Sequence, residues 1–135
     1  MSKTLKVGMI GYRFMGKAHS NGWRQAPHFF PLKADLEMHT ICGRTSAEVE
    51  KARAQYGWDH ASNDWRAVVA DPEIDVIDIN TPNDSHAEIA IAAAKAGKCQ
   101  LPWDIFVEAV TQTFNDKTIV CKNAFASDQP RKTWD

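Results

Sequence analysis

Two glycines near the N-terminus have a spacing that suits phosphate binding. Gly11 and Gly16 are the first and last glycines of a G-x-G-x-x-G pattern. An apolar run precedes Gly11 and a helical pattern follows Gly16, so the free N–H groups and the positive end of a helix dipole would meet a bound phosphate. The segment predicts a dinucleotide-binding loop. A plain strand-to-helix turn is the alternative interpretation.

The middle position of this pattern is Arg13 instead of glycine. The middle glycine normally lets the backbone come close to a pyrophosphate. The Cβ of Arg13 prevents the closest approach, whereas its guanidinium can pair with a phosphate. Two interpretations stay open: Arg13 is a phosphate ligand, or it points to solvent and weakens the site.

A second candidate ligand follows the next apolar run. In NAD sites an acidic residue about 20 residues beyond the glycines accepts the ribose 2′-hydroxyl. Here the run ends in Gly43, Arg44 and Thr45, with no acid. Arg44 can grip a 2′-phosphate with its charged fork, so we expect NADP(H) to be preferred over NAD(H). The alternative is that Arg44 is a solvated surface cation.

A third polar segment, Asn80-Thr81-Pro82-Asn83-Asp84-Ser85-His86, lies between a strand pattern and a helix pattern. Its candidate site residues are Thr81, Pro82, Asn83 and His86. It should therefore lie at the same carboxyl edge of the sheet as the glycine loop, where ligands bind in such sheets. The alternative is a capped turn with a surface histidine.

Positioning these loops requires a parallel sheet. Apolar runs predict strands at Leu5–Ile10, Leu36–Cys42 and Ile74–Ile79, with helices between them and room for one more short strand. This alternation predicts an α/β fold, a single domain with a doubly wound parallel sheet of the Rossmann-like type.

The helix ends are predicted from local signals. The first helix should run from about Phe14 to just before Pro27, because Met15, Ala18, Gly22 and Ala26 recur at helical spacing.

Two further helices carry sequence signals of capping at both ends. Thr45-x-x-Glu48 and Ser85-x-x-Glu88 have capping-box spacing, and Gly57 and Gly97 should end these two helices. A short helical turn is expected over Asp64–Ala70.

The pattern changes after Gln100. Leu101–Pro102 is expected to interrupt the next strand, Asp104–Phe114 suits a helix, and Thr118–Cys121 suits a short strand. We therefore expect a dinucleotide-binding domain over residues 1–100 and a divergent segment over residues 101–135.

Composition excludes several classes of function. The 135 residues carry a net charge of −1, which gives no broad attraction to nucleic acid or to a membrane surface. Cys42, Cys99 and Cys121 are widely spaced, so we expect neither a metal site nor a disulfide framework, and a reduced cytoplasmic setting. No apolar run is long enough for a membrane span. A homo-oligomer is compatible with the sequence.

Taken together, residues 6–100 resemble the N-terminal domain of the glucose–fructose oxidoreductase, inositol dehydrogenase and MocA (Gfo/Idh/MocA) family. The matching pieces are Gly8-Met9-Ile10-Gly11, Phe14-Met15-Gly16-Lys17-Ala18-His19, Asp75-Val76-Ile77-Asp78-Ile79, Thr81-Pro82-Asn83 with His86, and Ala96-Gly97-Lys98.

The resemblance implies a role for each loop. The pyrophosphate would be lined by Gly11, Tyr12, Arg13, Phe14 and Met15, and the adenosine ribose by Gly43, Arg44 and Thr45. The segment Thr81-Pro82-Asn83 with His86 would form the rim toward the nicotinamide. Family members generally oxidise or reduce sugars, cyclitols or related small polyols, so such a substrate is expected if a full-length form exists.

The sequence also departs from the family. Its Glu-Lys-Pro motif, whose lysine lies beside the reacting carbon, does not occur, and too few residues follow Gln100 to build the family's substrate domain. We therefore expect a truncated or altered chain and assign no catalytic residue. A rearranged gene, an altered reading frame and a genuine short variant all remain open.

Three functions follow from these observations. The chain is the cofactor-binding part of a family oxidoreductase, or a non-catalytic dinucleotide-binding domain, or a protein-interaction module. The last would use an aromatic-rich surface that comprises Trp23, Phe29, Phe30, Trp58, Trp65 and Trp103.

Overall fold

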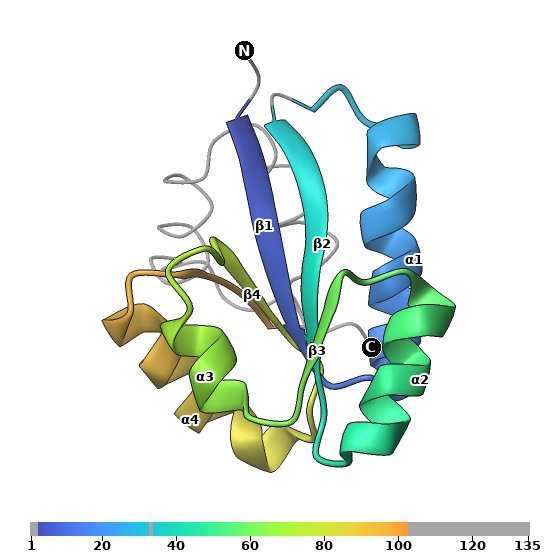
Figure 1. Ribbon diagram of the computed structural model, residues 1–135. Coiled ribbons are helices and arrows are strands. Elements are labelled where there is room, and N and C mark those ends of the chain that lie inside the picture. Colours follow the sequence, from blue (N-terminus) through green and yellow to red (C-terminus); the bar gives the residue numbers. More distant parts are fainter. Residues whose placement is uncertain (1–2, 33, 103–135) are drawn as a thin grey trace, which may run out of the picture.

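The strands of the described residues form one parallel sheet in the order β3-β2-β1-β4-β5 (Figure 1). The computed structural model describes residues 3–32 and 34–102. The strands are β1 (Lys3–Ile10), β2 (Ala34–Cys42), β3 (His60–Ser62), β4 (Val76–Ile79) and β5 (Cys99–Pro102). Every paired neighbour runs parallel, as predicted.

Helices cover both faces of this sheet (Figure 1). They are α1 (Phe14–Phe29), α2 (Ser46–Tyr56), α3 (Trp65–Ala70) and α4 (Asn83–Lys95). α1 and α2 lie on one face, and α3 and α4 lie on the other. The predicted doubly wound, Rossmann-like α/β fold is thereby confirmed.

Each face has its own hydrophobic cluster, because side chains alternate along each strand. On the α1 and α2 face the cluster contains Val7, Met9, Trp23, Ala26, Ile41, Val49, Ala52, Trp58 and Val76. On the α3 and α4 face it contains Ile10, Cys42, Val68, Val69, Ile74, Ile77, Ile79, Ile89 and Ala93.

The first helix differs from its prediction in where it ends. α1 continues through Pro27 to Phe29, because the Phe30 N–H bonds to the Ala26 carbonyl (3.0 Å) and proline removes one bond of the last turn without ending it. Its buried side comprises Gly16, His19, Ser20, Trp23 and Ala26, whereas Ala18 is exposed.

The two predicted capping boxes are wrong, because neither forms its capping hydrogen bonds. Thr45 is the N-cap of α2, but its side chain makes no capping bond, and the Glu48 carboxylate pairs instead with Lys51 (3.2 Å). α4 begins at Asn83, so Ser85 lies inside the helix. Pro82 occupies the cap position and fixes the φ angle that starts the helix.

The predicted interruption at Leu101–Pro102 is also wrong. Both residues belong to β5, where Asp78 pairs with Leu101 and Ile79 pairs with Pro102. Proline is tolerated here because β5 is the edge strand of the described sheet and needs no donor on its outer side. The elements predicted at Asp104–Phe114 and Thr118–Cys121 lie outside the described residues, and the division at residue 100 stays a prediction.

Candidate dinucleotide site

The three predicted loops meet at one edge of the sheet, at the point where the strand order reverses between β1 and β4. Ile10 and Ile79 are in register, so both strands end at the same level. The Gly11 N–H bonds to the Cys42 carbonyl (2.8 Å), and the Asn80 N–H bonds to the Ile10 carbonyl (2.7 Å). A crevice outside the carboxyl ends of the strands at such a reversal is where open α/β sheets bind ligands.

Two glycines of the first loop are required by the backbone. Gly11 has φ of +106°, and a Cβ there would lie 2.5 Å from the Asn80 carbonyl oxygen. A Cβ at Gly16 would overlap the Gly11 carbonyl. The loop can therefore turn this tightly against β4 only with glycine at both positions.

The N-terminus of α1 is uncapped by side chains. Arg13 is the N-cap residue with φ of −76°, and its side chain makes no capping bond. The Lys17 N–H is bonded to the Arg13 carbonyl (2.8 Å), so the N–H groups of the preceding turn have no partner within the helix. The side chains of Arg13 and Phe14 are exposed. This arrangement suits an anion.

Tyr12 joins the glycine loop to the end of β2. A Cβ at Gly43 would overlap the Tyr12 ring, so the ring packs over the space that Gly43 leaves. Arg44 and Thr45 follow and are exposed. The structure thus brings the first two predicted segments into contact.

Hydrogen bonds hold the loop after β4. The Ser85 hydroxyl donates to Thr81 Oγ1 (2.7 Å) and lies 2.9 Å from the Pro82 carbonyl. His86 Nε2 donates to the Thr81 carbonyl (2.5 Å). Nε2 carries its proton in this geometry, so it does not act as a base there. Asn83 is the first residue of α4.

Asn80 belongs to the third segment, but the sequence reasoning gave it no role in the site. Its side-chain Nδ2 and Oδ1 are buried and have no hydrogen-bond partner. A buried amide without partners is costly in a folded protein, and such groups are uncommon. The unpaired amide, the Gly11 turn and the uncapped α1 N-terminus lie together, so the residues present fit a dinucleotide. The sequence signal was an amide side chain directly after a buried strand.

A buried polar cluster lies between α1 and β4 and was also missed. Asp78 is completely buried, and it accepts hydrogen bonds from His19 Nδ1 (2.9 Å) and Trp23 Nε1 (2.8 Å). His19 and Trp23 are themselves buried. The cluster joins the helix behind the glycine loop to the strand that carries Asn80.

Cys42 lies at this edge of the sheet as a buried thiol. Burial raises the pKa of the Cys42 thiol to about 12, with a further contribution from the negative charge of Asp64. Cys42 is therefore a protonated thiol at neutral pH. Within residues 3–32 and 34–102, no three His, Cys, Asp or Glu side chains are grouped to hold a metal ion.

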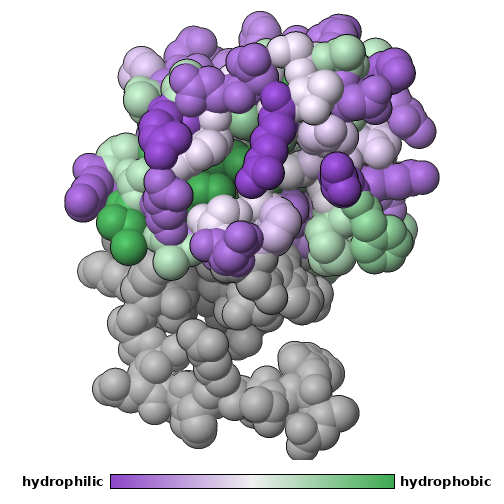
Figure 2. Space-filling model, turned by 90° about the horizontal axis from the view of Figure 1, so that it is seen from below, coloured by the Kyte–Doolittle hydropathy of each residue, from purple (hydrophilic) through white to green (hydrophobic). Residues whose placement is uncertain are grey.

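The surface around this edge is mostly polar. Viewed from below, the described part is largely hydrophilic, and a small hydrophobic area lies among the hydrophilic side chains (Figure 2). None of the helices in the described part of the chain has the length and apolar character that a membrane span requires.

Comparison with known proteins agrees with this geometry. Residues 5–116 match the oxidoreductase family with an NAD-binding Rossmann fold (GFO_IDH_MocA). Levoglucosan dehydrogenase from Pseudarthrobacter phenanthrenivorans is 41% identical over 130 residues, which cover 91% of this chain and 33% of the relative. An inositol 2-dehydrogenase/D-chiro-inositol 3-dehydrogenase from Lactiplantibacillus plantarum is 30% identical over 101 residues, which cover 72% of this chain and 27% of that relative.

A solved structure of levoglucosan dehydrogenase in complex with NADH superposes with a TM-score of 0.71 at 44% identity. The match covers 73% of this chain and 27% of that protein. The chain spans about a third of the length of the first of these curated relatives and less of the second. Because the family match includes more than half of its residues, this chain belongs to the Gfo/Idh/MocA oxidoreductase family, in the NAD-binding Rossmann fold.

Proposed function

We propose that this chain binds a nicotinamide dinucleotide between β1 and β4, as the cofactor-binding part of a dehydrogenase that acts on sugars or polyols. The observation that carries the proposal is the close packing of Gly11 on Asn80 beside the uncapped N-terminus of α1. When bound, the nicotinamide ring would accept or supply a hydride. The names of the two curated relatives support a sugar or polyol as substrate.

Each loop has one task in this proposal. Gly11, Tyr12, Arg13, Phe14 and Met15 hold the pyrophosphate, because the free N–H groups of α1 and the Arg13 guanidinium both attract an anion.

The two flanking loops hold the ends of the dinucleotide. Gly43, Arg44 and Thr45 hold the adenosine ribose, and the rim formed by Thr81, Pro82, Asn83 and His86 orients the nicotinamide. A cytoplasmic location and a homo-oligomer belong to the same proposal and await direct measurement.

Cofactor preference rests on Arg44. Gly43 to Ala47 contain no acid, and the first acid after β2 is Glu48, which is paired with Lys51. The exposed Arg44 guanidinium is thus placed to attract a 2′-phosphate, which favours NADP(H). The NADH complex of levoglucosan dehydrogenase supports NAD(H) as the second ligand.

Titration of the chain with NADPH and NADH tests both parts of the proposal. Quenching of tryptophan fluorescence by either cofactor would support binding, and no binding of either would refute it. Arg44→Ala should weaken NADPH about tenfold and leave NADH nearly unchanged, because a charged hydrogen bond contributes roughly 1.5–3 kcal/mol. Lys95→Ala is the control, since Lys95 is an exposed cation in the last turn of α4. Equal losses for both cofactors in Arg44→Ala would refute the NADP(H) preference alone.

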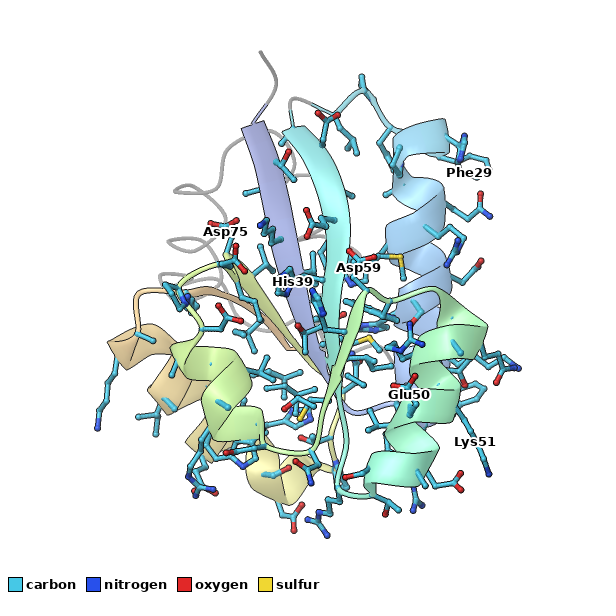
Figure 3. The ribbon with its side chains drawn as sticks, in the orientation of Figure 1. Phe29, His39, Glu50, Lys51, Asp59 and Asp75 are labelled. Atoms are coloured by element: carbon cyan, nitrogen blue, oxygen red, sulfur yellow. The ribbon has the colours of Figure 1, made fainter. Side chains whose placement is uncertain are left out.

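Two of the aromatic residues proposed for a protein-interaction surface are buried. Trp23 and Trp58 are each 2% exposed and belong to the core. Phe29 is exposed and points away from the sheet at one end of α1 (Figure 3), and Phe30 is its exposed neighbour. Trp65 is half-buried, and Trp103 lies outside the described residues. Among the described residues of this set, only Phe29 and Phe30 are exposed, which weakens this alternative.

A further inference from the structure

We propose that the Asn80 carboxamide binds the nicotinamide–ribose half of the dinucleotide and distinguishes it from the adenosine half. The inference rests on the proposed function and adds to it a residue that the predicted site residues do not include. Its basis is the unpaired, buried side chain at the reversal of the strand order.

The main chain fixes Asn80 at this point. Its N–H bonds to the Ile10 carbonyl (2.7 Å), and its own carbonyl fills the space beside Gly11 that any larger residue would need. The side chains of Val76 and Asp78 pack toward α1. Alternation along the strand places Asn80 on that same side, beneath the glycine loop.

The amide is not explained by the fold itself. Both Nδ2 and Oδ1 are buried without a partner, whereas Asp78, two residues earlier, is bonded to His19 and Trp23. An apolar side chain of similar size would avoid the loss of the hydrogen bonds that the amide makes to water in the unfolded chain. A ligand that pairs with the amide removes this penalty on binding.

The hydrogen-bonding groups of the Asn80 amide indicate which half of the dinucleotide it binds. A carboxamide has both a donor and an acceptor to satisfy. A phosphate offers only acceptors, whereas a ribose hydroxyl or the carboxamide of nicotinamide offers both. β2, with Gly43 and Arg44, lies on the other side of β1 from Asn80, so the adenosine ribose is proposed at the opposite end of the crevice. The nicotinamide–ribose half is the partner that matches.

The test compares a whole dinucleotide with its adenosine half. Wild type, Asn80→Ala and the control Asn21→Ala are titrated with NADH and with ADP, and the thermal midpoint of each apo chain is recorded. Asn21 is an exposed residue of α1.

Asn80→Ala should weaken the binding of NADH about tenfold, as expected for the loss of one or two neutral hydrogen bonds. It should leave ADP unchanged and should not lower the apo midpoint, because no protein bond is lost. Asn80→Ser, which keeps one hydroxyl, should recover part of the NADH affinity and serves as the test if the alanine variant does not fold.

Three results for Asn80→Ala would overturn the inference. The first is an affinity for NADH within twofold of the wild-type value, and the second is an equal loss of affinity for NADH and for ADP. The third is a large fall in the thermal midpoint of the apo chain with an unchanged affinity for NADH. If wild type binds neither NADH nor ADP, the proposed function fails first. If wild type binds both ligands and neither Asn80 variant changes NADH, the inference about Asn80 alone fails.

Discussion

Arg13 stands where dinucleotide-binding loops usually have their middle glycine, and the structure shows that the backbone does not require glycine there. Its φ of −76° is open to any L-residue, unlike the +106° of Gly11. The missing glycine therefore affects how closely a ligand approaches and leaves the fold of the loop unchanged. Its exposed guanidinium lies at the N-terminus of α1, where a cation and the helix dipole attract the same anion.

Arg13→Ala should accordingly weaken the binding of NADH and of NADPH by about tenfold each, since one charged hydrogen bond is lost. The salt dependence of binding should become shallower, because the removed interaction is one that salt screens. Titrations at two ionic strengths measure both effects. Lys95→Ala, in the last turn of α4, is the matched control for loss of an exposed cation. Tighter binding by Arg13→Gly would show that the arginine obstructs the site.

At the scale of elements, the Asp78 carboxylate joins α1 to β4. His19 and Trp23 donate to it from one face of the helix, and all three side chains are buried. Because α1 follows the glycine loop and β4 leads into Asn80, this cluster fixes the two sides of the crevice relative to each other. Removing a partner from a buried charged cluster is strongly destabilising.

Asp78→Asn should lower the free energy of unfolding by about 2–4 kcal/mol, because the new amide N–H₂ faces groups that also donate. Urea denaturation followed by tryptophan fluorescence measures the change. Asp59→Asn alters an exposed carboxylate and should change the stability by less than about 0.5 kcal/mol. Equal effects of the two substitutions would show that the buried cluster does not stabilise the packing of α1 on β4.

At the scale of the whole molecule, the described residues 3–32 and 34–102 bring together the loops proposed to hold a cofactor, and few ionisable side chains lie at their rim. Near the rim, the ionisable candidates for a base are Asp84 and His86, and His86 Nε2 is occupied in donating to the Thr81 carbonyl. The sequence lacks the Glu-Lys-Pro motif that the family uses beside the reacting carbon. Proton abstraction typically contributes a factor of about 10²–10⁴ to such reactions.

The 135-residue chain by itself is therefore expected to bind cofactor and to show no measurable oxidation of levoglucosan, myo-inositol or glucose with NAD⁺ or NADP⁺. Nicotinamide absorbance in single-turnover mixtures measures this, with cofactor binding established first by fluorescence. The control is the His86→Ala, Asp84→Asn double variant. A rate for wild type above that of the double variant would mean that the short chain carries its own catalytic groups.

The amino-acid sequence by itself determined the strand-loop-helix order, the parallel sheet and the edge at which the three loops meet. These features depend on local patterns: apolar runs for the strands, helical periodicity between them, and the glycines that turn the chain at Gly11 and Gly57. The two buried residues of α2, Val49 and Ala52, likewise lie at helical spacing.

Tertiary packing alone decided which polar side chains became internal. His19 and Asp78 are 59 residues apart in the chain, and no local pattern indicates that they pair. The burial of the Asn80 amide atoms is likewise a property of the folded chain, which the local sequence does not indicate. Pro27 and Pro102 act as local stop signals in sequence. α1 nevertheless continues through Pro27, because the Phe30 N–H still bonds to the Ala26 carbonyl, and β5 includes Pro102 as its last residue, paired with Ile79. Burial and pairing are properties of the assembled sheet, so only the folded structure fixes them.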